Sequence, residues 1–399
     1  MSGTRRKPGR MEPYIDGFRE RLSELGYTEG TIRGVLKEVG HLGRWMAAED
    51  VEAESLCGEL IESFLSFRRA GDTRQVPSAR SFAGLLEFLS DVGVLSTTTT
   101  ATAPFELLLA DYRAWMVIER GLAAPTVLRY EKLARRFLGA RADATDVLVA
   151  AELTAGDVTG FLLKEAARLS VGSAKGRVAE LRSLLRFLYL KGWTPCALAA
   201  TVPPVAGWHD TSLPAGIARA DVERVLASCD RDSATGARDA AILMLVARLG
   251  LRSAEVARLE FEDIDWRAGE IVVRGKARRR DRLPLPSDVG AALSAYLALP
   301  RRPTSIRRVF LAMKAPTRAI PPSLVSDVCH RACRRAGVEP VGAHRLRHSL
   351  ASELLRQGAT LVEVSQLLRH RDLATTAVYA KVDLSSLRAV AQSWPGDQQ

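Results

Sequence analysis

Two segments without helical or strand periodicity divide the chain, and they constrain its fold more than any other feature. STTTTATAP occupies residues 96–104, and TPCALAATVPPVAGWHDTSLPAG occupies residues 194–216. Both are rich in small residues, Pro, Gly or Thr, a composition typical of linkers. The 399 residues also exceed the roughly 100–200 residues of a typical single domain. We therefore expect three folded parts, separated by linkers at 96–105 and 194–216.

The first two parts resemble each other in sequence. Three pairs of segments align at offsets of 95, 97 and 99 residues. They are GYTEGTI (26–32) with GLAAPTV (121–127), IESFL (61–65) with VTGFL (158–162), and LLEFLSDVGV (85–94) with LLRFLYLKGW (184–193). Apolar residues at i, i+3 and i+4 predict a small helical domain in 1–95 and another in 106–193. A tandem duplication is favoured, and the alternative is a coincidental alignment of two leucine-rich helical units.

The third part, 217–399, combines helices with a small sheet. Helical patterns at its start give way to FEDIDWRAGEIVVRGKARRRDRLPLP, residues 261–286, in which short β-favouring runs are separated by turn residues and a basic tip. Helical patterns then resume. This order predicts a mainly α chain whose last domain is α+β, with a three-stranded antiparallel sheet.

The charge of the chain favours a polyanionic partner. Lys and Arg number 57 against 46 Asp and Glu, which gives a net charge of +11 and a pI near 9.7. Nucleic acid is the first candidate, because clustered cations are what bind its phosphates. A basic protein without such a partner is the alternative.

The sequence predicts no membrane span and no secretory signal. The longest apolar run, residues 240–247, is far shorter than the ~20 residues needed to cross a bilayer. The N-terminal MSGTRRKPGR has no hydrophobic stretch after its charges. Five cysteines, an odd number without a CxxC pair, suit a reducing compartment. We expect a cytoplasmic protein, associated with the nucleoid in a bacterium.

Two clusters could be metal ligands, and each has a better explanation. CHRAC, residues 329–333, has no second ligand pair nearby, and cysteines spaced i, i+4 on a helix more often belong to a core. His344 and His348 lie one helical turn apart, but the glutamate of an HExxH motif is absent and Arg347 would repel a cation. We expect neither a metal nor a cofactor.

Two helical segments of the third part could place cations at one site. In LGLRSAEVARL, residues 249–259, Gly250 can end one helix and Ser253 can cap the next, so that Arg252 lies at the junction. Glu255, at i+3, could hold that arginine, although such a pair is often only a surface ion pair. In AHRLRHSLAS, residues 343–352, an imidazole and a guanidinium are three residues apart on one helical face.

The hairpin tip and the last periodic segment add further reactive groups. RGKARRRDR, residues 274–282, presents Lys276 as a candidate proton donor, and the arginines beyond it, Arg278, Arg279 and Arg280, as candidate phosphate contacts. A simpler interpretation is a solvated charge run. LLRHRDLATTAVYAKV, residues 367–382, contributes His370 and Tyr379.

These groups fit one reaction. A tyrosine hydroxyl can attack a phosphodiester as a covalent nucleophile and store the energy of the broken bond. The pentavalent transition state gains negative charge, which fixed Arg, His and Lys donors can stabilise. A phenol with a pKa of about 10 also needs a proton acceptor. The sequence supplies all of these groups within its third part.

The order of these residues resembles the catalytic set of the tyrosine recombinases, also called the phage integrase family. The set spans 128 positions. It runs Arg252, Glu255, Lys276, His344, Arg347, His370 and Tyr379. The family more often has glycine where this chain has Arg369, a mild departure.

The resemblance implies a mechanism. Tyr379 would attack a backbone phosphate to give a 3′-phosphotyrosyl link and a free 5′-hydroxyl. Arg252 and Arg347 would bind the non-bridging oxygens. The remaining implied roles are His344 as proton acceptor, His370 as hydrogen-bond donor to the phosphate, Lys276 as acid for the leaving oxygen, and Glu255 and His348 as supporting residues.

The resemblance also implies an architecture. Residues 106–193 would be the core-binding domain, a SAM-like helical unit that clamps duplex DNA together with the catalytic domain, 217–399. Residues 1–95 would be an additional module for DNA binding or subunit contact. Further expected DNA contacts in the core-binding domain are Thr126, Arg129, Lys175 and Arg177.

The implied partners are double-stranded DNA with an inverted-repeat recombination site, a homotetramer assembled on it, and other recombinase subunits. The C-terminal tail, residues 382–394, has apolar residues at helical spacing and could pass to a neighbouring subunit or fold back on its own. The expected function is integration, excision or transposition of a mobile element. Two alternatives stay open: a type IB topoisomerase, and a catalytically silent DNA-binding regulator with the same fold.

Overall fold

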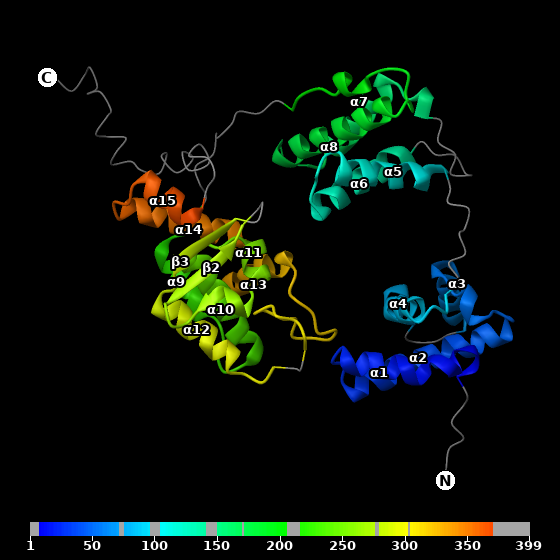
Figure 1. The fold of residues 1–399 in the computed structure, drawn as a ribbon, viewed down its shortest axis with the longest axis horizontal. Helices are drawn as coiled ribbons and strands as arrows, with labels where there is room; N and C mark the ends of the chain where they lie inside the picture. The colour runs from blue at the N-terminus through cyan, green and yellow to red at the C-terminus, as the bar shows by residue number, and fades with distance from the viewer. Residues whose placement is uncertain are drawn as a thin grey trace, which may run out of the picture. The chain divides into compact units, whose positions relative to one another are not determined.

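The structure is a computed structural model that describes residues 8–71, 76–95, 104–140, 150–169, 171–205, 216–275, 279–301 and 304–369. Its backbone forms two compact units, of which one is Thr97–His209 and the other combines Met1–Ser96 with Asp210–Gln399. Within the unit that combines the two ends of the chain, residues 8–95 and 216–369 have separate hydrophobic cores. The chain therefore has three regions: the N-terminal region (8–95), the second region (104–205) and the C-terminal region (216–369). The three regions are labelled in Figure 1.

The N-terminal region is entirely helical over its described residues. Its core contains Phe18, Phe64, Phe82 and other apolar side chains, with Phe64 and Phe82 packed edge to face at 5.9 Å. The α-helices are α1 (Ile15–Glu24), α2 (Glu29–Ala48), α3 (Gly58–Ala70) and α4 (Ala83–Asp91), and the 3-10 helices are η1 (Gly9–Tyr14), η2 (Ala53–Ser55) and η3 (Ala79–Phe82).

The second region follows the order helix, helix, 3-10 helix, helix, helix, and the N-terminal region differs by the 3-10 helix η3 between α3 and α4. Its elements are α5 (Pro104–Ile118), α6 (Ala124–Gly139), η4 (Ala150–Glu152), α7 (Ala155–Ala166), α8 (Val171–Leu190) and η5 (Leu198–Thr201). Thr154 begins α7 with a reciprocal capping box to Asp157. Tyr112 and Phe187 pack at 5.0 Å in the centre of its core.

Part of the segment that the composition assigns to a linker belongs to this second core. Leu198 and Val202 are 6% and 1% exposed and pack in the same cluster as α5 and α8. The carbonyl of Val202 also accepts a hydrogen bond from Arg182 at 2.8 Å. Ala199 and Val205 pack against the same cluster. The small-residue composition concealed this contribution, because a few apolar side chains spread among Pro, Ala and Thr make it.

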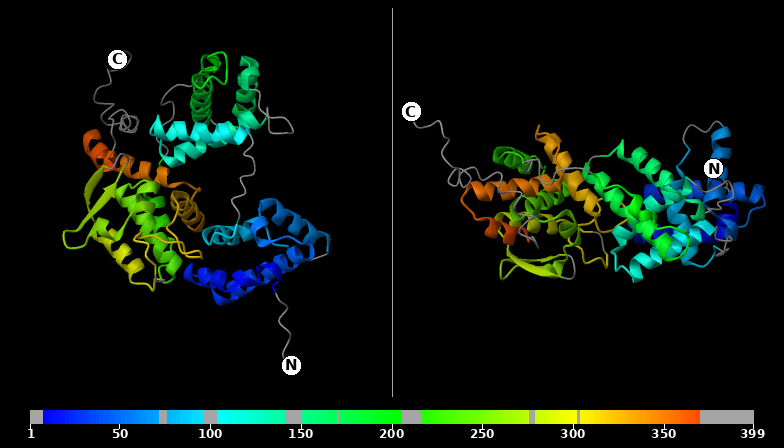
Figure 2. Two further views of the ribbon diagram at one scale, coloured as in Figure 1. Left: turned by 45° about the vertical axis from the view of Figure 1, so that its right-hand side comes forward. Right: turned by 90° about the horizontal axis from the view of Figure 1, so that it is seen from above.

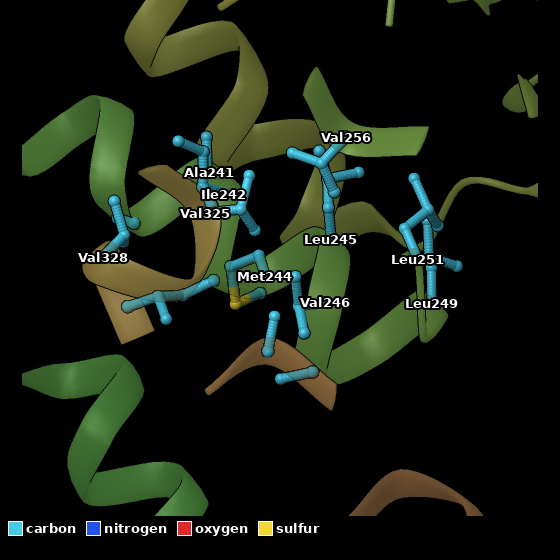
Figure 3. Packing of buried hydrophobic residues seen from close by; sticks show 14 of the residues in the cluster. Ala241, Ile242, Met244, Leu245, Val246, Leu249, Leu251, Val256, Val325 and Val328 are labelled. Carbon is cyan, nitrogen blue, oxygen red and sulfur yellow. The ribbon is translucent and has the colours of Figure 1, made fainter. Parts of the chain in front are cut away.

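The C-terminal region forms helices around a small sheet. Its elements are α9 (Arg219–Ala227), α10 (Ala234–Leu249), α11 (Ser253–Arg258), η6 (Phe261–Asp263), β1 (Ile264–Asp265), β2 (Glu270–Arg274), β3 (Arg280–Pro284), α12 (Ser287–Leu297), α13 (Pro322–Arg335), α14 (Ala343–Arg356) and α15 (Leu361–Leu368). Helix α10 is buried on all sides, as its continuous apolar run predicts. Figure 3 shows Ile242 and Leu245 of α10 in the same core as Val325 of α13.

The sheet is antiparallel in the order β1-β2-β3. Ile271 pairs with Ile264 on one side and Leu283 on the other, so one face of the sheet is apolar and closes the core. In both views of Figure 2 the β2–β3 hairpin lies at the periphery of the helical cluster. The predicted fold class, mainly helical with a small antiparallel sheet, is confirmed. None of the described helices combines the length and the apolar character needed to cross a membrane.

Candidate active site

The junction between α10 and α11 places Arg252 and Glu255 together. Gly250 ends α10 with a φ of 59°, in the left-handed region that glycine adopts without steric cost, as the sequence predicts. Arg252 then occupies the N-cap position, so the expected cap at Ser253 is wrong by one residue. Glu255 accepts the backbone N–H of Arg252 at 2.8 Å and its Nη1 at 2.7 Å. This carboxylate fixes the arginine at two points.

Helix α14 brings Arg347 to the same junction. Nη1 of Arg347 donates to the carbonyl of Gly250, and its Nη2 donates to the carbonyl of Leu368, so the guanidinium bridges the ends of α10 and α15. The residue is 2% exposed. The side chain of Arg252, in contrast, is 43% exposed. The resemblance implies that both arginines bind phosphate oxygens; the guanidinium of Arg252 faces solvent, whereas Arg347 is buried.

The two histidines of α14 lie next to each other. The rings of His344 and His348 contact edge to face at 4.2 Å between centroids. His344 is exposed, whereas His348 is half-buried. This arrangement leaves the first imidazole open to a substrate and places the second behind it.

The electrostatics of the site favour neutral imidazoles. Burial of part of the ring, together with the charges of Arg347 and Arg252, lowers the pKa of His344 below its ordinary value. Burial, the neighbouring His344 and Arg347 lower the pKa of His348 to about 4. A neutral imidazole beside fixed cations can accept a proton while those cations bind an anion.

The carboxylate of Glu255 stays ionised in this site. Burial would raise its pKa, but Arg369 and Arg252 outweigh that effect and hold the pKa below its ordinary value. Arg369 is not among the site residues predicted from the sequence. It follows α15 directly, with a φ of 55°. The only sequence signal was its departure from the glycine that the family more often has.

The basic hairpin tip is described in part. The backbone N–H of Gly275 donates to the carbonyl of Arg279 at 2.8 Å, which closes the hairpin. Arg279 and Arg280 are exposed, and Nε of Arg279 lies 2.7 Å from Asp281. Four predicted site residues lie outside the described residues: Lys276, Arg278, His370 and Tyr379.

The expected DNA contacts of the second region lie on α6 and α8. Arg129 and Arg177 meet at the buried carboxylate of Glu180, at 2.8 Å and 2.5 Å. Arg129 keeps 58% of its side chain exposed, whereas Arg177 keeps 25%. Thr126 and Lys175 are partly exposed. Glu180 therefore neutralises part of the positive charge of the two arginines that were predicted to contact DNA.

The two cysteines considered as metal ligands lie in a hydrophobic core. Cys329 and Cys333 are fully buried in the core of the C-terminal region, and burial raises the pKa of Cys329 to about 12. Across the described ranges, no three His, Cys, Asp or Glu side chains are grouped as metal ligands. The cysteines act as small apolar residues.

Comparison with known proteins matches this architecture. The phage integrase family model matches residues 217–385. The protein y4rA of Sinorhizobium fredii (strain NBRC 101917 / NGR234), an integrase/recombinase by name, is 38% identical over 393 residues, which are 97% of this chain and 95% of that protein. Tyrosine recombinase XerD of Listeria monocytogenes serotype 4b (strain F2365) is 30% identical over 71% of this chain and 96% of its own length.

A solved structure shows the same fold. XerH site-specific recombinase, in a post-cleavage complex with a palindromic difH substrate, aligns over 98% of both chains with a TM-score of 0.51 and 17% identity. Together with the similarity to y4rA along nearly the whole chain, these matches establish the family. The chain belongs to the phage integrase family, the tyrosine recombinases.

Proposed function

We propose that this protein cleaves and rejoins duplex DNA at a specific site through a 3′-phosphotyrosyl intermediate. One observation carries the proposal: Arg252, Glu255 and Arg347, from two helices far apart in sequence, meet at the Gly250 junction, and α15 ends at the same place. The sequence continues from there to His370 and, nine residues later, Tyr379. The nucleophile is therefore encoded close to the cation cluster that its reaction requires.

The site residues have distinct roles in this reaction. The exposed guanidinium of Arg252 binds a non-bridging phosphate oxygen, and Arg347 adds positive charge from beneath it. His344, which is exposed and has a lowered pKa, accepts the phenolic proton as the Tyr379 oxygen attacks phosphorus. Lys276 protonates the 5′-oxygen that leaves, and His370 donates a hydrogen bond to the phosphate. Protein cations thus neutralise the transition state.

A nicked suicide duplex tests the proposal. Wild-type protein is expected to form a covalent complex, because loss of the short cleaved fragment prevents religation. Tyr379→Phe should bind the duplex with unchanged affinity but form no covalent complex. Tyr296→Phe is the matched control, since that tyrosine stacks on Phe310 in the core of the same domain. Covalent capture by Tyr379→Phe would refute the nucleophile.

The same assay separates the alternative functions. Absence of any covalent complex from the wild-type protein would identify a silent DNA-binding regulator. Covalent capture and relaxation without strand joining between two duplexes would identify a type IB topoisomerase. Joining between two duplexes that carry inverted-repeat sites supports the recombinase.

We infer that the biological substrate is a mobile element that is integrated, excised or transposed. The match to y4rA includes the N-terminal region, whereas the match to XerD covers 71% of this chain. The N-terminal region therefore lies within the match to a relative that is named an integrase/recombinase, which supports the inference. Sequencing the DNA captured covalently in cells would test this: recovered junctions at the ends of an element support it, and a single chromosomal site without an element contradicts it.

Residues 1–95 fit a protein partner better than DNA. They contain 13 Lys and Arg against 15 Asp and Glu, whereas 217–399 contains 30 against 20. Because DNA affinity depends on cations that displace counterions, the N-terminal region is suited to contact a second recombinase subunit in a tetramer. Its deletion should reduce assembly on paired sites and leave the affinity for one half-site unchanged. Loss of half-site affinity would instead assign the region to DNA binding.

The C-terminal tail, 382–394, is proposed to dock on a neighbouring catalytic domain. A groove of about 240 Å³ between α9, α10 and α14 is apolar at Val222, Leu346 and Leu350 and has charged side chains among its lining residues. The tail has apolar residues at helical spacing, the pattern by which an amphipathic helix binds in an apolar groove. Deleting the tail should leave monomer cleavage of a suicide half-site intact and abolish tetramers, and unchanged tetramers would exclude the exchange.

A further inference from the structure

Arg369 is a buried cation at the end of α15 to which the reaction above assigns no role. Its side chain is 4% exposed. Its φ of 55° lies in the left-handed region, where a side chain is sterically disfavoured and glycine is not. Burial of a guanidinium is also unfavourable unless it is paired. Two unfavourable features at one position indicate compensating contacts.

Those contacts connect Arg369 to the residue that holds Arg252. Nη2 of Arg369 lies 2.7 Å from Oε2 of Glu255 and 3.4 Å from the carbonyl of Gly250, and its Nη1 donates to Leu367 at 2.9 Å. Oε1 of Glu255 accepts Nη1 of Arg252 at 2.7 Å. One buried carboxylate therefore binds two guanidiniums, on its two oxygens, from distant parts of the chain.

The backbone of Arg369 contacts Arg252 as well. Nη2 of Arg252 donates to the Arg369 carbonyl at 3.4 Å. The guanidinium of Arg252 is thus held by Glu255 on one nitrogen and by this carbonyl on the other. Both holding groups depend on Arg369, one through its side chain and one through its backbone.

We propose that Arg369 is a positioning residue for DNA cleavage, which fixes Arg252 through Glu255 and fixes the point from which the chain continues to His370. The inference rests on the proposed function. Glycine at this position would provide the left-handed turn but would leave Glu255 paired with Arg252 alone. Arg369 therefore adds to this turn an ion pair with Glu255, which connects the end of α15 to Arg252.

Arg369→Gly isolates the contribution of the side chain, because glycine keeps the turn accessible. Under single-turnover conditions with saturating suicide duplex, its cleavage rate should fall about 10- to 100-fold, as expected for a misplaced phosphate ligand. DNA affinity should change little. Arg369→Lys, which retains the charge, should recover part of the rate. Asp50→Gly is the matched control, since Asp50 also has a positive φ, of 53°, and an ion pair, to Arg10, far along the sequence from the site.

A double-mutant cycle tests the route through Glu255. In a Glu255→Gln background, Arg369→Gly should lower the cleavage rate less than twofold, because the shared carboxylate is already lost. A wild-type rate for Arg369→Gly, or an equal loss in both backgrounds, would overturn the proposal. An equal loss of rate and DNA affinity, without rescue by lysine, would show that Arg369 serves only the fold.

The proposal remains testable if the proposed function fails. Should wild-type protein form no covalent complex, the cycle is repeated on thermal unfolding of the full chain. The two substitutions should then lower the Tm by clearly less together than the sum of their separate effects. Additive shifts in Tm would overturn the link between Arg369 and Glu255, independently of any reaction.

Discussion

Substitution of Gly250 tests whether the junction is as tightly built as its contacts indicate. An alanine Cβ at 250 would lie 2.8 Å from Cδ2 of Leu368 and 3.2 Å from Cδ2 of Leu350, with Cγ of Arg347 at 3.8 Å. Leu368 is 0% exposed, so it has little room to move aside. The φ of 59° adds strain that glycine does not have. Gly250→Ala must therefore displace the buried side chain of Leu368 at the end of α15.

The magnitude follows from two contributions. The left-handed backbone costs a non-glycine residue about 1–2 kcal/mol, and displacing one buried leucine costs about 1 kcal/mol more. We expect the free energy of local opening to fall by about 2–3 kcal/mol, which corresponds to about 30- to 150-fold faster hydrogen exchange. The cleavage rate should fall too, because the Gly250 carbonyl accepts hydrogen bonds from Arg347 and Arg369.

Hydrogen–deuterium exchange with mass spectrometry measures this effect on peptides from α10, α14 and α15 separately. Gly290→Ala is the matched control, because its Cβ would meet only Leu285, at 3.7 Å, within helix α12. That substitution should be neutral or stabilise by up to about 1 kcal/mol. Exchange in α14 and α15 of Gly250→Ala that is indistinguishable from wild type would refute the reasoning.

Three further predictions concern charge. The neutral form of His344 accepts the proton, and its pKa is lowered, so the cleavage rate should begin to fall only when the pH drops below 6.5. A pH–rate profile in which the rate already falls above pH 6.5 would contradict this. In the folded protein His348 stays neutral down to about pH 4, whereas in the unfolded chain it binds a proton near pH 6.5. The free energy of unfolding should therefore fall as the pH drops from 6.5 to 4. His348→Gln should flatten this dependence in urea titrations. Alanine at residues 278–280 should weaken DNA binding equally for all sequences and lower the salt slope by about 2–3, and a change of sequence preference in binding titrations would argue against phosphate contacts.

Local signals in the sequence were sufficient for the elements of the C-terminal region. The apolar run of α10, the glycine at its end and the turn residues of the hairpin all act within a few positions of the chain. The cap of α11 was misplaced by one residue because Arg252 is an unusual N-cap and Ser253 a common one. The start of α11 is fixed by the Glu255 carboxylate, which accepts the backbone N–H of Arg252, and not by the side chain of the N-cap residue itself. The identity of the N-cap residue is then a poor guide to its position.

The contacts between distant segments could not be predicted from the sequence. The order of residues predicted that Arg347 belongs to the site, but its burial depends on carbonyls of Gly250 and Leu368 that only the tertiary fold brings to it. The pairing of Arg369 with Glu255 has the same origin. Likewise, Arg177 and Glu180 are neighbours on one helix, whereas the approach of Arg129 from α6 follows from packing.

Mass spectrometry of the trapped protein–DNA complex tests the central claim most directly. After nuclease and tryptic digestion, we predict one adducted peptide, residues 372–381, with a nucleotide joined through its 3′-phosphate to the oxygen of Tyr379. An adduct on any other residue, or one joined through a 5′-phosphate, would contradict the mechanism.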